Sequence, residues 1–507
     1  MDESQQRQLY LIGLSGELSV KGDATRRRFT ERLEANLRLA LRERAIDFRL
    51  ERRRSRLLLA ADSPQAAEVA RRVFGVAWVA PAEVRTYSGL DHLLAQGAEI
   101  FTPQVAGRSF AVRARRGDRA GDPPFRSPEV ESRLGALLRP GARAVDLEAP
   151  EVEARLEIEH DQAFFFGRRQ AGEGGFPIGS QGEALALVSG GFDSVVAAWL
   201  LLRRGLKLDF FLAGLGGREH RNQVLAILRR LWLDWGAGSR PKLFVADFRP
   251  LVVELELAAP AALRQVLLKR QMLRAATVFA RRRPAAALAT GEALGQVSSQ
   301  TLANLAAVAE ASELPLLRPL LATSKDEILA LARKIGSFEA SARVPEHCFL
   351  GVKNPSTAAG RKELAAAEAK LDPAIFEGVI RLAEKIDLTA EPPVEDGASA
   401  GAAEVELPWP GVPLYDLRAP QAFAAWHPEG AVSLPYPAAL KALAAGELPP
   451  LQEVCLLCEI GYKSAHLAEL LAARGVRAAS LKGGAGPLRE KLADPLLLAA
   501  LSPAVRD

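Results

Sequence analysis

The chain has 507 residues, too many for one hydrophobic core, and indicates three or four domains at roughly 150 residues each. Hydrophobic residues make up 49% and charged residues 25%, a composition typical of globular proteins and not of disordered chains. No uninterrupted apolar run is long enough to span a membrane, and the acidic, polar start Met1-Asp2-Glu3-Ser4 does not resemble a signal peptide. We therefore expect a cytoplasmic protein without a membrane partner.

The cysteine count limits the chemistry. There are three cysteines, Cys348, Cys455 and Cys458, and an odd, sparse set argues against a secreted disulfide scaffold. Six scattered histidines do not complete a four-ligand zinc site, so we predict no metal site built from protein ligands alone. The cysteines are therefore either inert core residues or reactive ones.

The net charge is +5, and arginines cluster in the first quarter of the chain. The clusters are Arg26–Arg28, Arg52–Arg54 with Arg56, and Arg113–Arg119. A single cluster is equally well explained as solvated surface charge. Three clusters in one region favour a surface that binds a phosphate backbone.

The first 170 residues predict α+β structure. Residues 9–12 and 49–60 are expected strands, and a helix between them repeats apolar residues every four positions at Phe29, Leu33, Leu37 and Leu41. Alternating patterns at 109–115 and 152–158 predict two half-buried strands. The glycine-rich stretch 172–179 has the composition of a hinge or a tight connection.

From residue 184 onward the pattern changes. Short apolar runs alternate with helical stretches, which is typical of a parallel α/β sheet. The runs are Ala184–Val188, Leu208–Leu212, Leu243–Phe248 and Ala285–Ala289. Residues 389–404, rich in Pro, Gly, Ala and acid, resemble a linker, and the last hundred residues predict another small α/β unit.

The first apolar run leads directly into Ser189-Gly190-Gly191-Phe192-Asp193-Ser194 and then into a helical stretch. A glycine-rich turn between a strand and a helix presents free N–H groups and the positive end of the helix to an anion. No Gly-Lys-Ser/Thr follows, so this is not a Walker loop. It resembles the pyrophosphate loop of enzymes that split ATP into AMP and pyrophosphate, with Asp193 placed to hold Mg²⁺ or to cap the helix.

Two later segments support a nucleotide site. Thr290–Thr301 follows another apolar run and is small and polar enough to line a pocket. Ser324 and Glu327 form an expected capping box, which places Lys325 in an exposed first turn that can reach a phosphate. Lys269 and Arg270 are either a surface pair or an ATP contact.

With these motifs the whole chain resembles the tRNA 4-thiouridine synthase (tRNA sulfurtransferase) family. The segments that carry the resemblance are 174–179, 189–194, 290–301, 318–320 and 345–348. The resemblance implies a ferredoxin-like domain at 1–62, a THUMP RNA-binding domain at 63–169, a parallel-sheet pyrophosphate-loop domain at 170–388, a linker at 389–404 and a rhodanese-like α/β domain at 405–507. The expected fold class is therefore multidomain, α+β and α/β.

The resemblance also implies roles by position. Asp193 and Lys325 match residues needed for activation, and Cys348 matches the cysteine that closes a disulfide with the persulfide carrier. The positions expected to contact ATP, taken from the loop and the family together, are Leu187, Val188, Ser189, Gly190, Gly191, Asp193, Ser194, Lys269, Gly291 and Gln300.

The last domain resembles rhodanese. Cys458 opens the loop Cys458–Ser464 between a strand and a helix, where backbone N–H groups and the helix end favour a thiolate or persulfide anion. The alternative is a Cys455–Cys458 redox pair, although the apolar run 454–457 favours Cys455 as a core residue. Glu459 departs from related loops, which more often carry a neutral or basic residue there.

These features predict ATP-dependent transfer of sulfur from a Cys458 persulfide to a uridine of tRNA, position 8 in the family, through an adenylated base. The expected substrates and partners are ATP with Mg²⁺, tRNA and a cysteine desulfurase. Sulfur transfer to a carrier protein for thiamine thiazole synthesis is the alternative. Lysidine-type enzymes and amidotransferases share the loop but have no use for Cys348 and a rhodanese tail, and a lone rhodanese would not need the long N-terminal portion. A non-enzymatic RNA-binding protein is disfavoured by the intact loop. The oligomeric state stays open, with a homodimer as one candidate.

Overall fold

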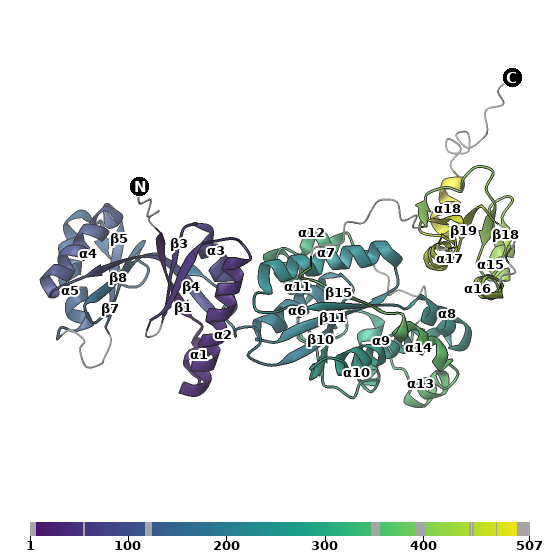
Figure 1. Cartoon of the computed structure of the whole chain (residues 1–507), viewed down its shortest axis with the longest axis horizontal. Coiled ribbons are helices and arrows are strands. Elements are labelled where there is room, and N and C mark those ends of the chain that lie inside the picture. The colour runs from purple at the N-terminus through teal and green to yellow at the C-terminus, as the bar shows by residue number, and fades with distance from the viewer. Residues whose placement is uncertain are drawn as a thin grey trace, which may run out of the picture. The chain divides into compact units, whose positions relative to one another are not determined.

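The computed structural model describes residues 7–53, 56–116, 124–345, 355–390, 402–445, 448, 451–472 and 474–493 (Figure 1). The chain divides into two compact units, the first made of residues 1–183, 199–208 and 231–239 and the second of the remaining residues. Within the described ranges, no helix is both long and apolar enough to cross a membrane.

The first unit is built on a nine-stranded sheet with the order β2-β3-β1-β4-β8-β7-β5-β6, and β9 also pairs with β4. The strands are β1 (Gln8–Leu14), β2 (Phe48–Arg52), β3 (Arg56–Ala61), β4 (Val76–Thr86), β5 (Ser109–Arg116), β6 (Ala144–Val145), β7 (Val152–Glu159), β8 (Gln162–Phe166) and β9 (Gln170–Ala171). The helices are α1 (Gly16–Ser19), α2 (Asp23–Arg42), α3 (Gln65–Arg72), α4 (Leu90–Val105) and α5 (Ser127–Leu138).

The predicted helical face is confirmed, because all four of its apolar residues are buried on α2. The single strand predicted over 49–60 is wrong. The structure has an antiparallel pair, β2 and β3, with Phe48 opposite Ala61 and Arg52 opposite Leu57. Residues 53–55, between the two strands, include no Gly or Asn, the residues that mark a short hairpin turn. The sequence therefore did not indicate two separate strands.

The long strand β4 belongs to both halves of the sheet. Its first part pairs with β1 and its second part, from Ala82 to Thr86, pairs with β8. Helix α3 and Val76 lie in the same hydrophobic core as β1 and α2. Because that core continues past residue 62, we propose that the division between the ferredoxin-like part and the THUMP part falls inside β4.

The glycine-rich stretch 172–179 is a tight connection. A Cβ on Gly172 would lie 2.5 Å from the Val76 carbonyl oxygen, and one on Gly175 would lie 2.2 Å from that of Arg203. Gly175 also has a φ of +70°, a conformation that glycine adopts without strain. The backbone of this segment therefore packs directly against its neighbours.

The second unit contains a six-stranded sheet with the order β14-β13-β10-β11-β12-β15. Its strands are β10 (Glu183–Leu187), β11 (Lys207–Gly214), β12 (Lys242–Asp247), β13 (Ala287–Ala289), β14 (Leu316–Leu317) and the antiparallel edge strand β15 (Glu384–Asp387). The associated helices are α6 (Phe192–Arg203), α7 (Gly217–Trp235), α8 (Arg249–Ala258), α9 (Arg264–Arg281), α10 (Leu302–Ala309), α11 (Lys325–Lys334), α12 (Phe338–Ala342), α13 (Arg361–Glu368) and α14 (Pro373–Arg381). Phe279 of α9 stacks on Phe211 and Phe244, and all three belong to one hydrophobic core.

The C-terminal part is a five-stranded parallel sheet with the order β16-β20-β19-β17-β18. Its elements are β16 (Ala403–Val405), β17 (Leu414–Asp416), α15 (Pro420–Ala425), β18 (Val432–Ser433), α16 (Tyr436–Ala445), β19 (Glu453–Leu457), α17 (Tyr462–Ala472), β20 (Arg477–Leu481) and α18 (Ala485–Leu492). Side chains of β19 alternate between two hydrophobic clusters on opposite faces. The predicted fold class, α+β followed by two α/β domains, is confirmed.

Candidate functional site

The nucleotide loop lies at a point where the order of the parallel strands reverses. Strand β10 is followed in the chain by β11 on one side of the sheet and later by β13 on the other side. In open α/β sheets, such a switch point leaves a crevice at the carboxyl ends of the strands, and ligands bind there. The loop after β10 and the segment 290–301 after β13 both begin at this edge.

The loop is held by its own hydrogen bonds. The Ser189 N–H donates to Ser194 Oγ at 3.3 Å, and Ser194 Oγ–H donates to the Gly191 carbonyl oxygen at 3.1 Å. Gly190 has a φ of +82°, and a Cβ there would lie 2.9 Å from Val224. A Cβ on Gly191, by contrast, would meet nothing closer than Ser189 Oγ at 3.6 Å. The loop is therefore tight beneath Gly190 and open beside Gly191.

Two residues expected to contact ATP lead into this loop from β10. Leu187 is the last residue of the strand and is half-buried, and Val188 is buried. The Val188 N–H donates to the Phe211 carbonyl oxygen at 2.9 Å and so keeps the chain paired with β11 until the loop begins.

Asp193 is the centre of a polar cluster. Lys325 Nζ donates to Asp193 Oδ1 at 2.8 Å, and Gln296 Nε2 donates to Asp193 Oδ2 at 3.1 Å. The predicted capping box of Ser324 and Glu327 is confirmed, and it starts α11 with Lys325 as the first helical residue. Asp193 lies one residue inside α6 with both carboxylate oxygens engaged by side chains, so it does not serve as the helix cap. Sequence reasoning singled out Asp193 and Lys325 but gave Gln296 no role.

Gly291 brings the two loops into contact. A Cβ at this position would lie 2.6 Å from the backbone carbon of Asp193 and 2.6 Å from the Ser194 nitrogen. Any side chain would push the segment after β13 away from the nucleotide loop. Glycine is therefore required for the close approach that lets Gln296 reach Asp193.

Lys269 is bound to a buried acid. Glu292 accepts from Lys269 Nζ at 2.9 Å and from Arg318 Nε at 2.9 Å, and Thr290 also donates to it. Burial acts to raise the pKa of Glu292, but the attraction and hydrogen bonds of Lys269 and Arg318 outweigh it and hold the pKa below 4.5. The surface-pair alternative for Lys269 and Arg270 is wrong, because both are largely buried and ion-paired.

Gln300 lies in a short 3₁₀ turn, and its backbone N–H and carbonyl are both hydrogen-bonded within the 290–301 segment. Its side-chain Oε1 is buried and has no hydrogen-bond partner among the described residues. A buried acceptor without a donor is costly, which makes it a suitable partner for a donor group of a ligand.

His220 was missed by sequence reasoning. It is 3% exposed on the first turn of α7, and its Nε2 lies 2.9 Å from the Ser189 carbonyl oxygen. Burial lowers its pKa below 6.5, against the opposing effect of the Ser189 hydrogen bond. The sequence did offer one signal for His220. It follows the apolar run of β11, and the carboxyl end of that strand lies next to the end of β10.

The sulfur loop of the C-terminal domain surrounds Cys458 with donors. Cys458 is 1% exposed, and its Sγ accepts from the N–H groups of Gly461 at 3.1 Å and Ser464 at 3.4 Å. Ser464 Oγ lies 3.3 Å from the sulfur and donates to the Gly461 carbonyl oxygen at 3.0 Å. This arrangement stabilises negative charge on sulfur, as predicted from the strand–loop–helix pattern.

Cys455 faces the other side of the sheet. It packs with Leu457 and Leu481, whereas Cys458 belongs to the opposite cluster. Three residues along a strand separate the two Cα atoms by about 10 Å, well beyond the roughly 4.4–6.8 Å of a disulfide. Burial also raises the pKa of the Cys455 thiol. The structure therefore favours Cys455 as a core residue.

Glu459 lies at the mouth of the loop with a largely exposed side chain. Its carboxylate is 4.0 Å from Arg418, which is itself buried and bonded to Asp416 at 2.6 Å. Arg418 thus counters part of the extra negative charge that Glu459 introduces beside the sulfur.

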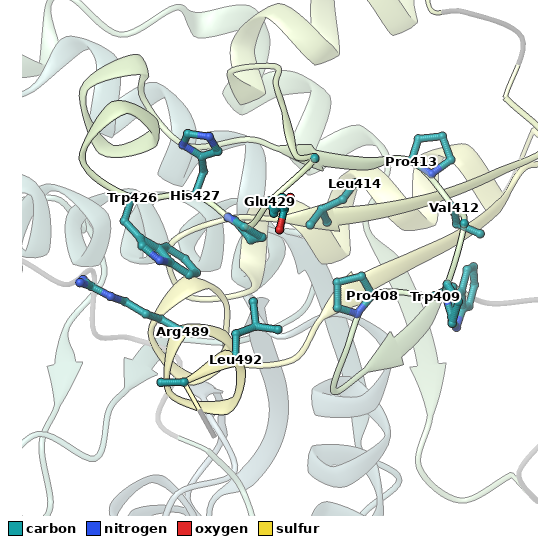
Figure 2. A pocket seen from close by; sticks show the side chains of 15 residues that line it. Pro408, Trp409, Val412, Pro413, Leu414, Trp426, His427, Glu429, Arg489 and Leu492 are labelled. Carbon is teal, nitrogen blue, oxygen red and sulfur yellow. The ribbon is translucent and has the colours of Figure 1, made fainter. Parts of the chain in front are cut away.

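A second hollow in this domain is not the sulfur site. A pocket of about 750 Å³ is lined by Trp409, Leu414, Trp426, His427 and Arg489 among others (Figure 2). It lies where β17 begins and just before β18, at the amino ends of these parallel strands. Cys458 follows the carboxyl end of β19, so pocket and sulfur lie at opposite edges of the sheet.

Cys348 lies outside the described residues. Across the ranges given above, no group of three or more His, Cys, Asp or Glu side chains could hold a metal ion. Five arginines of the first two clusters form ion pairs, namely Arg26–Asp23, Arg27–Glu31, Arg52–Glu34, Arg53–Glu51 and Arg56–Glu157. A phosphate that binds these arginines would therefore compete with the carboxylates that already pair with them.

Comparison with family models gives three matches along the chain. Residues 179–372 match the family described as thiamine biosynthesis protein (ThiI), residues 11–80 match the ThiI ferredoxin-like domain, and residues 400–486 match the rhodanese-like domain.

Several curated relatives cover most of the chain. A tRNA sulfurtransferase of Pyrobaculum aerophilum is 35% identical over 92% of this chain and 95% of its own length. One from Desulfurococcus amylolyticus is 34% identical over 95% of this chain and 98% of its own. One from Pectobacterium atrosepticum is 33% identical over 81% of this chain and 86% of its own.

Two solved structures share the fold. The crystal structure of a 4-thiouridine synthetase–RNA complex with bound ATP covers 75% of this chain and 99% of its own, with a TM-score of 0.66 and 24% identity. A structure from Pyrococcus horikoshii covers 65% of this chain and 99% of its own, with a TM-score of 0.51 and 21% identity.

Proposed function

Because the chain belongs to the tRNA sulfurtransferase family of enzymes, we propose that it converts a uridine of tRNA to 4-thiouridine with ATP and a Cys458 persulfide. One observation carries this proposal. The same chain holds a loop suited to a nucleotide phosphate and a loop suited to a sulfur anion, each placed at the carboxyl end of a parallel sheet.

The residues of the first loop fit ATP. Gly191 leaves the backbone open to a phosphate, and the amino end of α6 favours negative charge. The unpartnered Oε1 of Gln300 suits a donor such as the exocyclic amine of adenine. Asp193 is the acid placed to bind Mg²⁺ together with phosphate oxygens, and such an ion would neutralise the pyrophosphate that departs.

The uridine must first be activated, because a carbonyl oxygen is a poor leaving group. We propose that the C4 oxygen attacks the α-phosphorus of ATP, so that the bond to pyrophosphate breaks and AMP becomes attached to the base. Lys325, 2.8 Å from Asp193, is placed to balance the charge that builds on the phosphates.

Sulfur transfer then follows in two displacements. The terminal sulfur of the Cys458 persulfide attacks C4, the C4–O bond breaks and AMP leaves. The Cys348 thiolate next attacks Sγ of Cys458, which releases 4-thiouridine and leaves a Cys348–Cys458 disulfide. A two-electron reductant must reopen this disulfide, and a cysteine desulfurase supplies the next persulfide sulfur.

The first 170 residues would bind the RNA. The THUMP part and the ferredoxin-like part share one sheet. Arginines such as Arg26 and Arg27 stay exposed to solvent although they are ion-paired, and they suit recognition by backbone and shape. The fold match to a synthetase that was solved with RNA and ATP supports this assignment.

The experiment is to express the chain in cells that lack 4-thiouridine and to quantify this nucleoside in digested tRNA by mass spectrometry. We expect wild type to restore it and the Cys458→Ala, Cys348→Ala and Asp193→Ala variants to fail. If wild type restores nothing while a cysteine desulfurase and reductant are present, the assignment to tRNA is wrong.

A second function is favoured by the match to the family described as a thiamine biosynthesis protein. In this case the Cys458 persulfide would pass sulfur to a sulfur-carrier protein used for the thiazole of thiamine. Growth of a thiazole-requiring strain without added thiazole, dependent on Cys458, would support it. Unchanged thiazole dependence after expression of the chain would exclude it.

A further inference from the structure

The nucleotide loop rests on helix α7, although α7 contributes no residue to the loop motif itself. Two residues one helical turn apart meet the loop from below: His220 reaches the Ser189 carbonyl oxygen, and Val224 lies beneath Gly190. The i, i+4 spacing places both on one face of α7. The two contacts fall on consecutive residues of the loop, at the point where β10 ends.

We propose that His220 is a positioning residue for ATP, which fixes the orientation of the Ser189–Gly190 peptide and thereby aims the loop N–H groups at the phosphates. The inference rests on the proposed use of ATP at this loop and adds a residue from outside the motif to it.

The hydrogen bond has one direction. A carbonyl oxygen can only accept, so Nε2 carries the proton and donates to Ser189. This bond ties the carbonyl towards α7, and the following N–H of Gly190 then points away from it, because the two groups of a trans peptide face opposite sides. The positive φ of Gly190 turns the next part of the chain towards the open side beside Gly191.

Loss of the bond would free this peptide to rotate. Gly190 and Gly191 have no side chains to resist such a rotation, and glycine has the largest conformational freedom of any residue. The other bonds of the loop, from Ser189 N–H and from Ser194 Oγ, do not hold the Ser189 carbonyl. His220 is therefore the described contact that fixes this group, and ATP binding should report its loss.

The test measures ATP binding to the full chain by calorimetry in wild type, His220→Leu and His220→Gln. Leucine keeps the apolar volume without a donor, and glutamine keeps an N–H at similar reach. We expect His220→Leu to weaken ATP binding about tenfold, the value of one net hydrogen bond, and His220→Gln to recover most of the loss. In steady-state turnover, KM for ATP should rise more than kcat falls.

Leu228→Ala is the matched control. Leu228 is buried on the same helix, about 12 Å further along its axis than His220. It should lower the melting temperature at least as much as His220→Leu while ATP affinity stays at the wild-type value. Persulfide loading of Cys458 should be equal in all four proteins.

Each contrary result has a distinct meaning. If wild type does not bind ATP, the proposed function fails and this inference falls with it. If wild type binds ATP and His220→Leu binds it equally well, the inference alone is wrong. It is also wrong if Leu228→Ala weakens ATP as strongly, or if His220→Gln is as weak as His220→Leu, because the residue then acts only through packing.

Discussion

The nucleotide loop and the sulfur loop have nearly the same local construction. Each follows a parallel strand and leads into a helix, and each ends in a serine whose hydroxyl donates to a glycine carbonyl three residues earlier, Ser194 to Gly191 at 3.1 Å and Ser464 to Gly461 at 3.0 Å. Each also contains a glycine with positive φ, Gly190 or Gly461.

They differ in what surrounds them. The nucleotide loop depends on side chains from distant elements, since Gln296 and Lys325 both reach Asp193. The sulfur loop is almost self-contained, because the donors to Cys458 lie within six residues of it. A large ligand with several charges needs groups from several elements of the fold, whereas one sulfur atom can be surrounded by a single turn. Substitutions should therefore separate the two loops in function.

The largest effect should come from Cys458→Ala. Without a sulfur carrier we expect no detectable 4-thiouridine, while tRNA-dependent pyrophosphate release continues because the first loop is intact. Mass spectrometry of tRNA and a pyrophosphate assay measure the two steps. Cys455→Ala is the control, and it should keep thiolation and lose only about 1 kcal/mol of stability as a small core truncation. Loss of pyrophosphate release in Cys458→Ala would mean that the loops are not independent.

The converse variant is Asp193→Asn or Lys325→Met. Removing either charge should lower tRNA-dependent pyrophosphate release by about 10²–10³-fold, as expected for groups that stabilise developing charge. Persulfide on Cys458, detected as a mass increase after incubation with a cysteine desulfurase and cysteine, should be unchanged. Asp326→Asn, at the exposed residue next to Lys325, should behave as wild type. If pyrophosphate release also fell a hundredfold in Asp326→Asn, the loss in Lys325→Met would reflect damage to helix α11 and not the missing charge of Lys325.

A smaller effect is expected for Gly291→Ala. The added methyl would lie 2.6 Å from the backbone of Asp193, so the segment after β13 must move away from the loop. A displacement of about 1 Å can cost about a hundredfold in rate, and we expect a ten- to hundredfold fall in pyrophosphate release. Gly378→Ala, in open space on α14, should slightly stabilise the protein without changing activity. Full activity of Gly291→Ala would contradict the close approach.

The smallest effect concerns stability and pH. The pKa of Glu292 is lowered in the folded protein, so its stabilising contribution is present above pH 4.5 and is lost as the pH falls through the folded value. Glu292→Gln should therefore lower the thermal midpoint at pH 7 and lie closer to wild type as the pH falls below 4.5. Thermal unfolding at several pH values measures this difference. If the difference in thermal midpoint between wild type and Glu292→Gln grew as the pH fell, the proposed pairing of Glu292 would be contradicted.

Much of this architecture could be predicted because its signals are local. The apolar runs, the Ser-Gly-Gly loop and the capping box of α11 each lie within a few neighbouring residues. The position of Cys458 after a buried strand was also sufficient to predict its cradle of N–H groups. Resemblance to the family then gave roles to Asp193 and Lys325.

The remaining features depend on which elements become neighbours. Nothing near Gln296 in the sequence shows that it will reach Asp193, 103 residues earlier. His220 is a single histidine among polar residues in the first turns of α7, and its role depends on α7 packing beneath the end of β10. Ion pairs likewise changed the interpretation of Lys269, Arg52 and Arg56, because their acidic partners lie on other elements.

Strand β4 has a mechanical consequence for the N-terminal region. Its eleven residues pair with β1 along one part and with β8 along another. One continuous backbone is therefore hydrogen-bonded into both halves of the sheet. Twisting one half against the other would shear rows of inter-strand hydrogen bonds. The two halves should therefore move as a single arm of fixed length, and a cut or an insertion within β4 should disable both together. Evolution could exchange this arm as one piece, but could not easily exchange either half alone.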